Sequence, residues 1–133
     1  MKAGCVVGYS EELHITVSED HYPVFSSKVI HPVYSTASLV SDMEWVSRKC
    51  ILPFLEEHEE GMGGAVTVRH VAPCTKGTIV TLEAVVTEVT PQKVVTLVEA
   101  STKNELIGKG TVTQLIVSKE KIQQLLQQAT LRR

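Results

Sequence analysis

Several features that would mark particular functions are scarce or absent in this sequence. Aromatic residues make up only 5% of it, and the net charge is −2 with the basic residues scattered along the chain. Neither a platform for base stacking nor a basic stripe for nucleic-acid phosphates is therefore available. The three cysteines are far apart and form no CxxC pair, and no HExxH or comparable ligand set occurs. We expect neither nucleic-acid binding nor a metal site.

Long apolar runs are absent as well. No stretch is apolar enough over enough residues to span a bilayer, and Met1 to Gly8 lacks the apolar run of a signal peptide. We expect a cytoplasmic protein without a membrane partner, in which Cys50 and Cys74 are small core residues. A length of 133 residues with 43% hydrophobic residues suits one domain, residues 1–133, with a substantial core.

The first half of the chain predicts a strand, a loop and a long helix. Leu13 to Val17 alternates apolar and polar residues, which is the period of a half-buried strand. Residues 20–35 contain two prolines and indicate a loop. From Ser38 to about Glu57 the apolar residues fall on one helical stripe, and Pro53 is expected to kink its end. The glycines of residues 59–64 suit a helix cap or tight turn.

The second half predicts four strands and a final helix. The expected strands, separated by short turn signals, are Ala65–Val71, Thr78–Val89, Lys93–Ser101 and Glu105–Val117. Short turns favour antiparallel pairing, and Ser118 is expected to cap a last amphipathic helix that runs to about Gln128. One long helix followed by strands is an α+β pattern. Because a single sheet leaves its edge strands open, we expect two sheets to pair edge to edge in a dimer.

Two residues of the long helix are candidates for chemistry. Glu44 lies at the margin of the apolar stripe, where a carboxylate can be partly desolvated, as acid–base catalysis requires. The simpler interpretation, which periodicity alone favours, is a surface ion pair with Arg48 one turn later. Thr36 precedes the helix and would ordinarily be its N-cap, but it could serve as a nucleophile beside a base. About 12 Å of ideal helix separates Thr36 from Glu44, so a third group must bridge them unless the chain leaves helical geometry before Ser38.

His70 is the best-placed third group. It ends the first long strand of the second half, where an imidazole can act as a general base near neutral pH, although such a histidine more often makes only a strand-end hydrogen bond. Gly63 allows a close approach of backbone to a ligand, so its N–H could hold an oxyanion, whereas the alternative is a plain turn. Gly108 and Gly110 indicate a bulge or a strand against which another element presses.

Taken together, these residues indicate a protein family more specifically than any one of them does alone. The segments concerned are Thr36, Met43-Glu44-Trp45, Pro53-Phe54-Leu55, Gly63 to His70 and Gly108-Lys109-Gly110-Thr111. Through them the chain resembles the fluoroacetyl-CoA thioesterase family and its hot-dog relatives from about Tyr34 to Val117. The resemblance implies an α+β hot-dog fold, a curved antiparallel sheet wrapped around a central helix. It implies an acyl-CoA thioesterase that needs no cofactor, since coenzyme A is part of the substrate.

The resemblance also implies roles for particular residues. Thr36, Glu44 and His70 would form the catalytic set, and the amide of Gly63 would polarise the thioester. Two departures concern specificity: Gln114 stands where the family has an arginine on the last strand, and Ile30 stands in a lid segment that carries phenylalanine in the family. We therefore expect a short-to-medium acyl chain without fluoroacetyl discrimination. A protein that binds an acyl-CoA or another small apolar ligand without turnover is the alternative.

Partners follow from the same resemblance. Hot-dog sites generally lie between subunits, so we expect a homodimer or a higher oligomer with the coenzyme A arm along the subunit junction. The nucleotide end of coenzyme A carries phosphates, which a chain of net charge −2 must meet with local positive charge. Arg69, Lys76, Lys103 and Lys109 are the candidates for this contact, although each alone could be an ordinary solvated surface charge.

Overall fold

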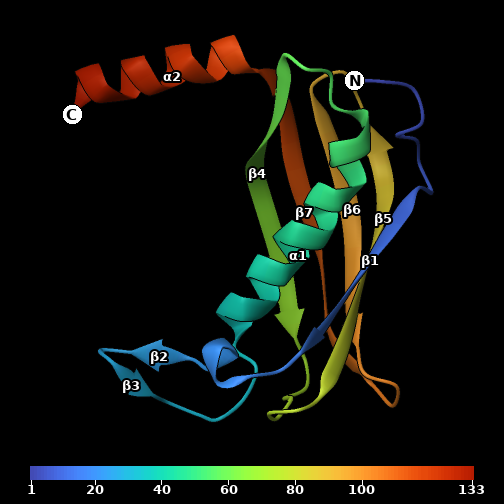
Figure 1. The fold of residues 1–133 in the computed structure, drawn as a ribbon, viewed down its shortest axis with the longest axis vertical. Coiled ribbons are helices and arrows are strands. Elements are labelled where there is room, and N and C mark those ends of the chain that lie inside the picture. Colours follow the sequence, from blue (N-terminus) through green and yellow to red (C-terminus); the bar gives the residue numbers. More distant parts are fainter.

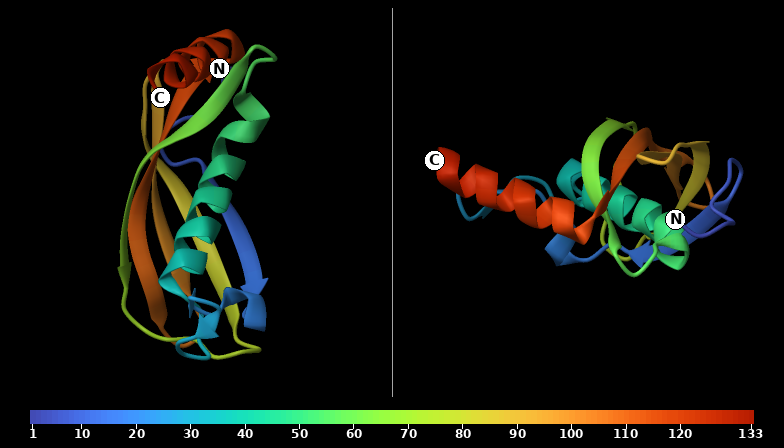
Figure 2. Two further views of the ribbon diagram at one scale, coloured as in Figure 1. Left: turned by 90° about the vertical axis from the view of Figure 1, so that its left-hand side faces the viewer. Right: turned by 90° about the horizontal axis from the view of Figure 1, so that it is seen from above.

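A five-stranded antiparallel sheet wraps around one long helix. The computed structural model describes residues 1–133. The strands lie in the order β1-β5-β6-β7-β4, so that β1 and β4 form the two edges. Their bounds are β1 Ser10–Thr16, β4 Glu59–His70, β5 Ile79–Val89, β6 Lys93–Ser101 and β7 Leu106–Ser118. Helix α1, Thr36–Ile51, lies in the concave side of the curved sheet (Figure 1; Figure 2). The expected α+β hot-dog architecture is confirmed.

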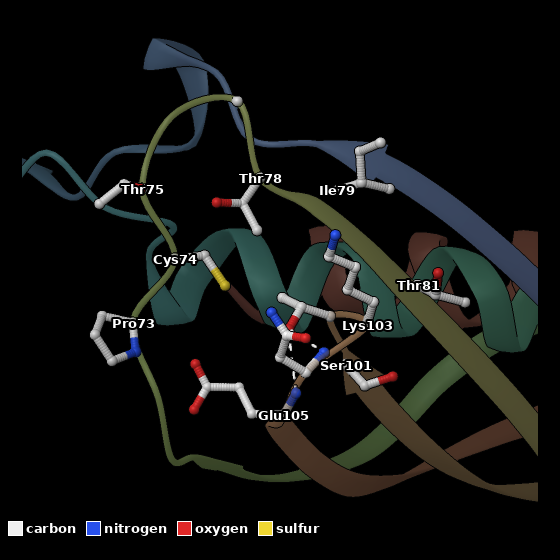
Figure 3. A pocket seen from close by; sticks show the side chains of 12 residues that line it. Pro73, Cys74, Thr75, Thr78, Ile79, Thr81, Ser101, Lys103 and Glu105 are labelled. Atoms are coloured by element: carbon white, nitrogen blue, oxygen red, sulfur yellow. Dashed lines mark hydrogen bonds between the residues drawn. The ribbon is translucent and has the colours of Figure 1, made fainter.

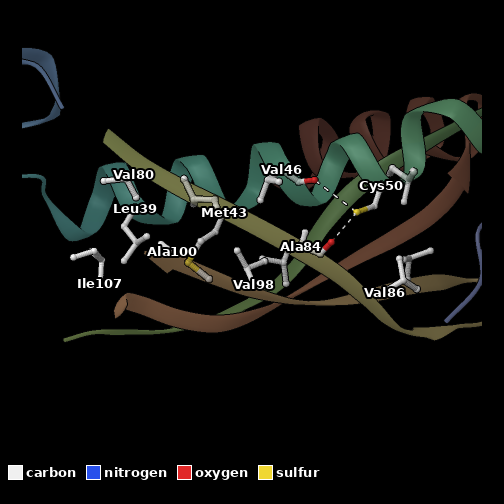
Figure 4. Packing of buried hydrophobic residues seen from close by; sticks show 14 of the residues in the cluster. Leu39, Met43, Val46, Cys50, Val80, Ala84, Val86, Val98, Ala100 and Ile107 are labelled. Atoms are coloured by element: carbon white, nitrogen blue, oxygen red, sulfur yellow. Dashed lines mark hydrogen bonds between the residues drawn. The ribbon is translucent and has the colours of Figure 1, made fainter. Parts of the chain in front are cut away.

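The core fills the space between α1 and the sheet. Alternate residues of β5 and β6 are buried, which is the two-residue period of strands with one face covered. Leu39, Met43 and Val46 of α1 face Ala84 of β5 and Val98 of β6 (Figure 4). Their burial removes apolar surface from water at about 25 cal/mol per Å², which is the main stabilising contribution to this arrangement. Cys50 and Cys74 are buried, as predicted.

The helix ends earlier than predicted. It ends at Ile51 rather than near Glu57, and Pro53 lies in a short 3₁₀ turn, Leu52–Phe54. Proline has no N–H to donate and its ring clashes with the preceding helical turn, so the α-helical ladder stops here. The expected cap or turn over residues 59–64 is wrong, because these residues begin β4. A Cβ on Gly61 would lie 2.5 Å from Cδ1 of Ile51, so this glycine lets the strand pass close to the end of α1.

Residues 20–35 contain more structure than the predicted loop. A 3₁₀ turn, Glu19–His21, is followed by a small hairpin of β2, Val24–Phe25, and β3, Lys28–Val29. Its two-residue turn holds Ser26 at φ 50° and Ser27 at φ 64°. This left-handed pair is the backbone of a type I′ turn, for which Asn-Gly is the usual sequence signal. Two serines give no such signal, and the hairpin was missed for that reason.

The last helix projects from the body of the molecule. Ser118 caps α2, Lys119–Arg132, by accepting a hydrogen bond from the backbone N–H of Lys121 at 3.0 Å, which confirms the predicted start. The helix continues four residues beyond the predicted end at Gln128. It extends sideways past β4, and none of its residues is buried (Figure 1). No helix of this chain is both long enough and apolar enough to cross a membrane.

Candidate active site

Thr36 and His70 meet at one end of the sheet. Thr36 is the first residue of α1, and His70 is the last residue of β4. The hydroxyl oxygen Oγ1 of Thr36 lies 2.8 Å from Nδ1 of His70, within hydrogen-bond distance. Thr36 is free for this contact because Ser35, not Thr36, is the N-cap: its side chain accepts a hydrogen bond from Ser38 N at 3.0 Å. The default interpretation of Thr36 as the N-cap is therefore wrong.

Tyr34 holds the imidazole of His70 from one side. The two rings meet edge to face with their centroids 6.3 Å apart. Tyr34 is fully buried, and its hydroxyl donates to Oδ2 of Asp42 at 2.6 Å, which fixes the ring against the first turns of α1. Neither Tyr34 nor Asp42 was predicted from the sequence to support the site. Their eight-residue separation carries no motif, and only the folded chain brings them together.

The surroundings of His70 set its protonation. Burial raises the cost of the charged form and lowers the pKa of His70 from its ordinary value, so the imidazole is neutral near neutral pH. A neutral imidazole that accepts the Thr36 proton at Nδ1 carries its own proton on Nε2. This Nε2 is buried and has no hydrogen-bond partner within the chain. Buried polar atoms are nearly always paired, so this N–H is available to an acceptor from outside the chain.

Glu44 does not join this pair within one chain. It is exposed on α1, and no hydrogen bond or ion pair connects it to Thr36 or His70. The expected ion pair with Arg48 is wrong, because Arg48 binds Oε1 of Glu60 at 2.9 Å instead. Glu60 lies near the start of β4, beside the last turns of α1, and its carboxylate competes successfully for the guanidinium. The carboxylate of Glu44 is thus left without a partner in the chain.

Gly63 of β4 and Gln114 of β7 lie together in the first half of β4, away from His70. They face each other across β4 and β7, next to a bulge between Gly63 and Ala65. A Cβ on Gly63 would meet no atom within 4 Å, so the space beside its backbone is open. The buried side chain of Gln114 donates from Nε2 to the backbone oxygen of Ser47 at 2.9 Å. Seven residues of strand place Gly63 roughly 20 Å from His70, too far to act on the same bond from one chain.

Ile30 follows the β2–β3 hairpin near the beginning of α1. It is 49% exposed, and its backbone N–H donates to Pro23 O at 2.9 Å. Phe25, in the same hairpin, is 69% exposed. The hollow at His70 has a volume of only about 230 Å³ and is lined by residues on both sides of the site, Val33, Tyr34, Val71, Ala72 and Pro73. This is smaller than typical ligand pockets of 300–1,000 Å³, so a single chain encloses too little space for an acyl thioester.

Comparison with known proteins gives consistent matches. Residues 17–120 match the model of a family described as fluoroacetyl-CoA-specific thioesterase. The fluoroacetyl-CoA thioesterase of Streptantibioticus cattleyicolor is 31% identical over 98 residues, which is 74% of this chain and 70% of that protein. The matched family segment contains Thr36, Glu44, Gly63, His70 and Gln114.

Solved structures agree with the sequence matches. A thioesterase superfamily member from Thermus thermophilus is 35% identical with a TM-score of 0.92, over 98% of this chain and 96% of that one. A mutant of the fluoroacetyl-CoA-specific thioesterase, in complex with fluoroacetate and CoA, is 28% identical with a TM-score of 0.79. That similarity covers 88% of this chain and 98% of the other.

Proposed function

The chain belongs to the fluoroacetyl-CoA thioesterase family and is a thioester hydrolase that acts on acyl-CoA, and we propose that its reaction centre is built on Thr36, His70 and Glu44. The observation that carries this proposal is the 2.8 Å contact between Thr36 Oγ1 and His70 Nδ1. A hydroxyl beside a neutral imidazole is the arrangement that activates an otherwise weak oxygen nucleophile.

The first step follows from this contact. Nδ1 of His70 takes the proton of the Thr36 hydroxyl as its oxygen attacks the thioester carbonyl, and the imidazolium then protonates the departing thiolate of coenzyme A. The resulting acyl-threonine is an ester, which water hydrolyses with a carboxylate or imidazole as general base. Direct attack by water is the competing route. The contact favours the threonine route, because the hydroxyl of Thr36 already occupies the position that a water would need.

We propose that a second copy of the chain completes the site. Gly63 is too far from the His70 of its own chain, and Nε2 of His70 is unpaired. The edge strand β4 has a neighbour only on its β7 side. We propose that β4 pairs antiparallel with its copy about a two-fold axis midway between Val66 and Thr67. Residues equally distant from the axis then lie opposite each other, so Gly63 of the partner subunit lies opposite His70. Its amide can then face the thioester oxygen.

The homodimer is expected to be stable in dilute solution. Light scattering at micromolar concentration should give twice the chain mass of 14.6 kDa. The physical reason is that the edge strand β4 leaves a row of unpaired backbone groups, which a second sheet can satisfy. A monomeric species with full activity would show that one chain suffices and would exclude this arrangement.

The acyl group is proposed to be short to medium in length, without preference for fluorine. Discrimination of one fluorine needs a polar contact or a shaped lid, since size alone gives weak selectivity. Gln114 has no fixed charge, and its amide nitrogen is already bonded to Ser47 O. Ile30 offers bulk without an aromatic face. Only the exposed Phe25 could supply an aromatic ring from the hairpin.

A panel of acyl-CoAs tests the substrate proposal. The purified chain is assayed with acetyl-, fluoroacetyl-, butyryl- and longer acyl-CoAs, and free coenzyme A is followed with a thiol reagent. We expect turnover of the shorter chains, with kcat/KM for fluoroacetyl-CoA within about tenfold of that for acetyl-CoA, because the lining residues offer only weak discrimination. A preference of several orders of magnitude for the fluorinated thioester would contradict the specificity. Saturable binding without release of thiol would contradict catalysis and favour a binding protein.

A further inference from the structure

A second, larger hollow opens beside the candidate active site. Its volume is about 850 Å³, within the range of small-ligand pockets. It lies between the loop of residues 73–78, which joins β4 to β5, and the turn of residues 102–105, which joins β6 to β7 (Figure 3). Neither the catalytic proposal nor the lid at Ile30 uses this space.

The hollow lies within reach of a molecule that reacts at His70. Pro73 lines both this hollow and the small one at His70. Gly108 of β7 pairs with His70, and Glu105, at the rim of the hollow, lies three residues from Gly108, about 10 Å along the strand direction. The extended pantetheine arm of coenzyme A is longer than this separation. A thioester held at His70 can therefore place its other end in the hollow by passing Pro73.

The lining of the hollow is polar and rich in hydroxyl groups. Only two of its 12 lining residues are hydrophobic. Five side chains carry a hydroxyl: Thr75, Thr78, Thr81, Ser101 and Thr102. Oγ1 of Thr102 accepts the backbone N–H groups of Asn104 and Glu105, both at 3.2 Å, so its own hydrogen remains available for an acceptor. Such a surface suits a hydrated, oxygen-rich ligand rather than an acyl chain.

Lys103 provides the positively charged side chain in the lining of this hollow. Lys76, within the loop of residues 73–78, is paired with Glu19 at 3.1 Å, and Lys109 of β7 is paired with Glu99 at 3.4 Å. Lys103 forms no ion pair, and its side chain extends from the turn toward Thr78 and Ile79, where the loop passes into β5 (Figure 3). Of the lysines expected from the sequence to meet phosphates, Lys103 alone is uncommitted to a carboxylate.

We propose that this hollow binds the nucleotide end of coenzyme A, its 3′,5′-ADP part, with the phosphates at Lys103. The inference rests on the proposed function, because that function fixes the thioester end of the same molecule at His70. Glu105 points to the opposite side, toward Pro73 (Figure 3). Its carboxylate repels phosphate and accepts hydrogen bonds from ribose hydroxyls or the adenine amino group. The two charges thus orient a ligand that is anionic at one end and a hydrogen-bond donor at the other.

Direct binding tests this assignment without turnover. Calorimetry compares coenzyme A with pantetheine, which lacks the nucleotide, for the wild type and for Lys103→Gln and Lys109→Gln. Wild type should bind coenzyme A more tightly than pantetheine, and added salt should reduce the difference. Lys103→Gln should weaken coenzyme A binding about two- to fivefold, as expected for one exposed charge pair, and leave pantetheine binding unchanged. The matched control, Lys109→Gln, should bind both ligands as the wild type does.

Two results would overturn the assignment. One is equal coenzyme A affinity for Lys103→Gln and Lys109→Gln, and the other is equal weakening of coenzyme A and pantetheine by Lys103→Gln. Neither result bears on hydrolysis, which depends on His70. Conversely, a His70 variant that hydrolyses at the wild-type rate would remove the proposed reaction centre while leaving this binding comparison intact.

Discussion

Replacing His70 with alanine is expected to lower kcat/KM for the best acyl-CoA substrate by roughly 10²- to 10⁴-fold, the usual contribution of a general base. The variant loses the nitrogen that lies 2.8 Å from the Thr36 hydroxyl, and no other base contacts that hydroxyl. The measurement is initial-rate kinetics with a thiol reagent. Circular dichroism and thermal melting confirm that the variant is folded, since the imidazole contributes only an edge contact with Tyr34 and the bond to Thr36.

Four companion variants separate the roles in the catalytic set. Thr36→Ser keeps a hydroxyl and should retain most activity, whereas Thr36→Ala should lose about as much as His70→Ala. The Thr36→Ala/His70→Ala double variant should lose little more than either single one, because the two side chains act as a unit. Glu44→Gln should reduce the rate without reducing stability, since Glu44 is exposed and unpaired. Wild-type rates for both His70→Ala and Glu44→Gln would show that the assignment is wrong.

The pH profile gives a readout that a structural role for His70 would not produce. The base must be neutral to accept a proton, so kcat/KM should fall as the pH drops through the pKa of His70. Burial lowers this pKa below its ordinary value. Activity should therefore persist to more acidic pH than an unperturbed histidine would allow, and this titration should be absent from the residual activity of His70→Ala.

Periodicity in the sequence was enough to find most of the fold. The alternation of residues 79–89 and 93–101 identifies β5 and β6, since every second residue there faces α1. The turn between β5 and β6 carries a proline signal at Pro91, and the turn after β6 carries an asparagine signal at Asn104. The beginning of β4 was missed for a physical reason. The glycines in residues 59–64 have a low intrinsic preference for strands, and pairing with β7, which is distant in sequence, overrides that preference.

The candidate site was less accessible to sequence reasoning. Helix geometry predicts that Thr36 and Glu44 cannot touch, and His70 was the residue expected to bridge them; within one chain, of these two, His70 contacts Thr36 only. The contact between Thr36 and His70 joins residues 34 positions apart, and only the meeting of β4 with the start of α1 creates it. The pairing of Arg48 with Glu60 likewise could not be foreseen, because the i,i+4 rule considers only neighbours on the same helix. The separation of Gly63 and His70 within one chain follows from the extended geometry of β4, and the motif by itself does not reveal it.

Gly110→Ala should be the most destabilising substitution that adds only a methyl group. A Cβ at this position would overlap the carbonyl oxygen of Thr67 on β4 and would lie 2.9 Å from Cε of Met43. The methionine can move aside, but the Thr67 backbone belongs to the β4–β7 ladder and cannot move without breaking it. We expect a loss of about 3 kcal/mol in the free energy of unfolding, near the upper end for overpacking substitutions.

Gly63→Ala is the matched control, because it lies on the same pair of strands and its Cβ would meet no atom within 4 Å. It should unfold within about 1 kcal/mol of the wild type, since it adds no clash and strands favour residues other than glycine. Urea titrations of all three proteins give the unfolding free energies, with equal m-values required for the comparison. If Gly110→Ala is too unstable to purify while Gly63→Ala is normal, the close approach of β4 to Gly110 is supported. If the two alanine variants are equally stable, β4 does not lie against Gly110 as described. That result would also contradict the contact between His70 and Thr36, because His70 is the last residue of β4.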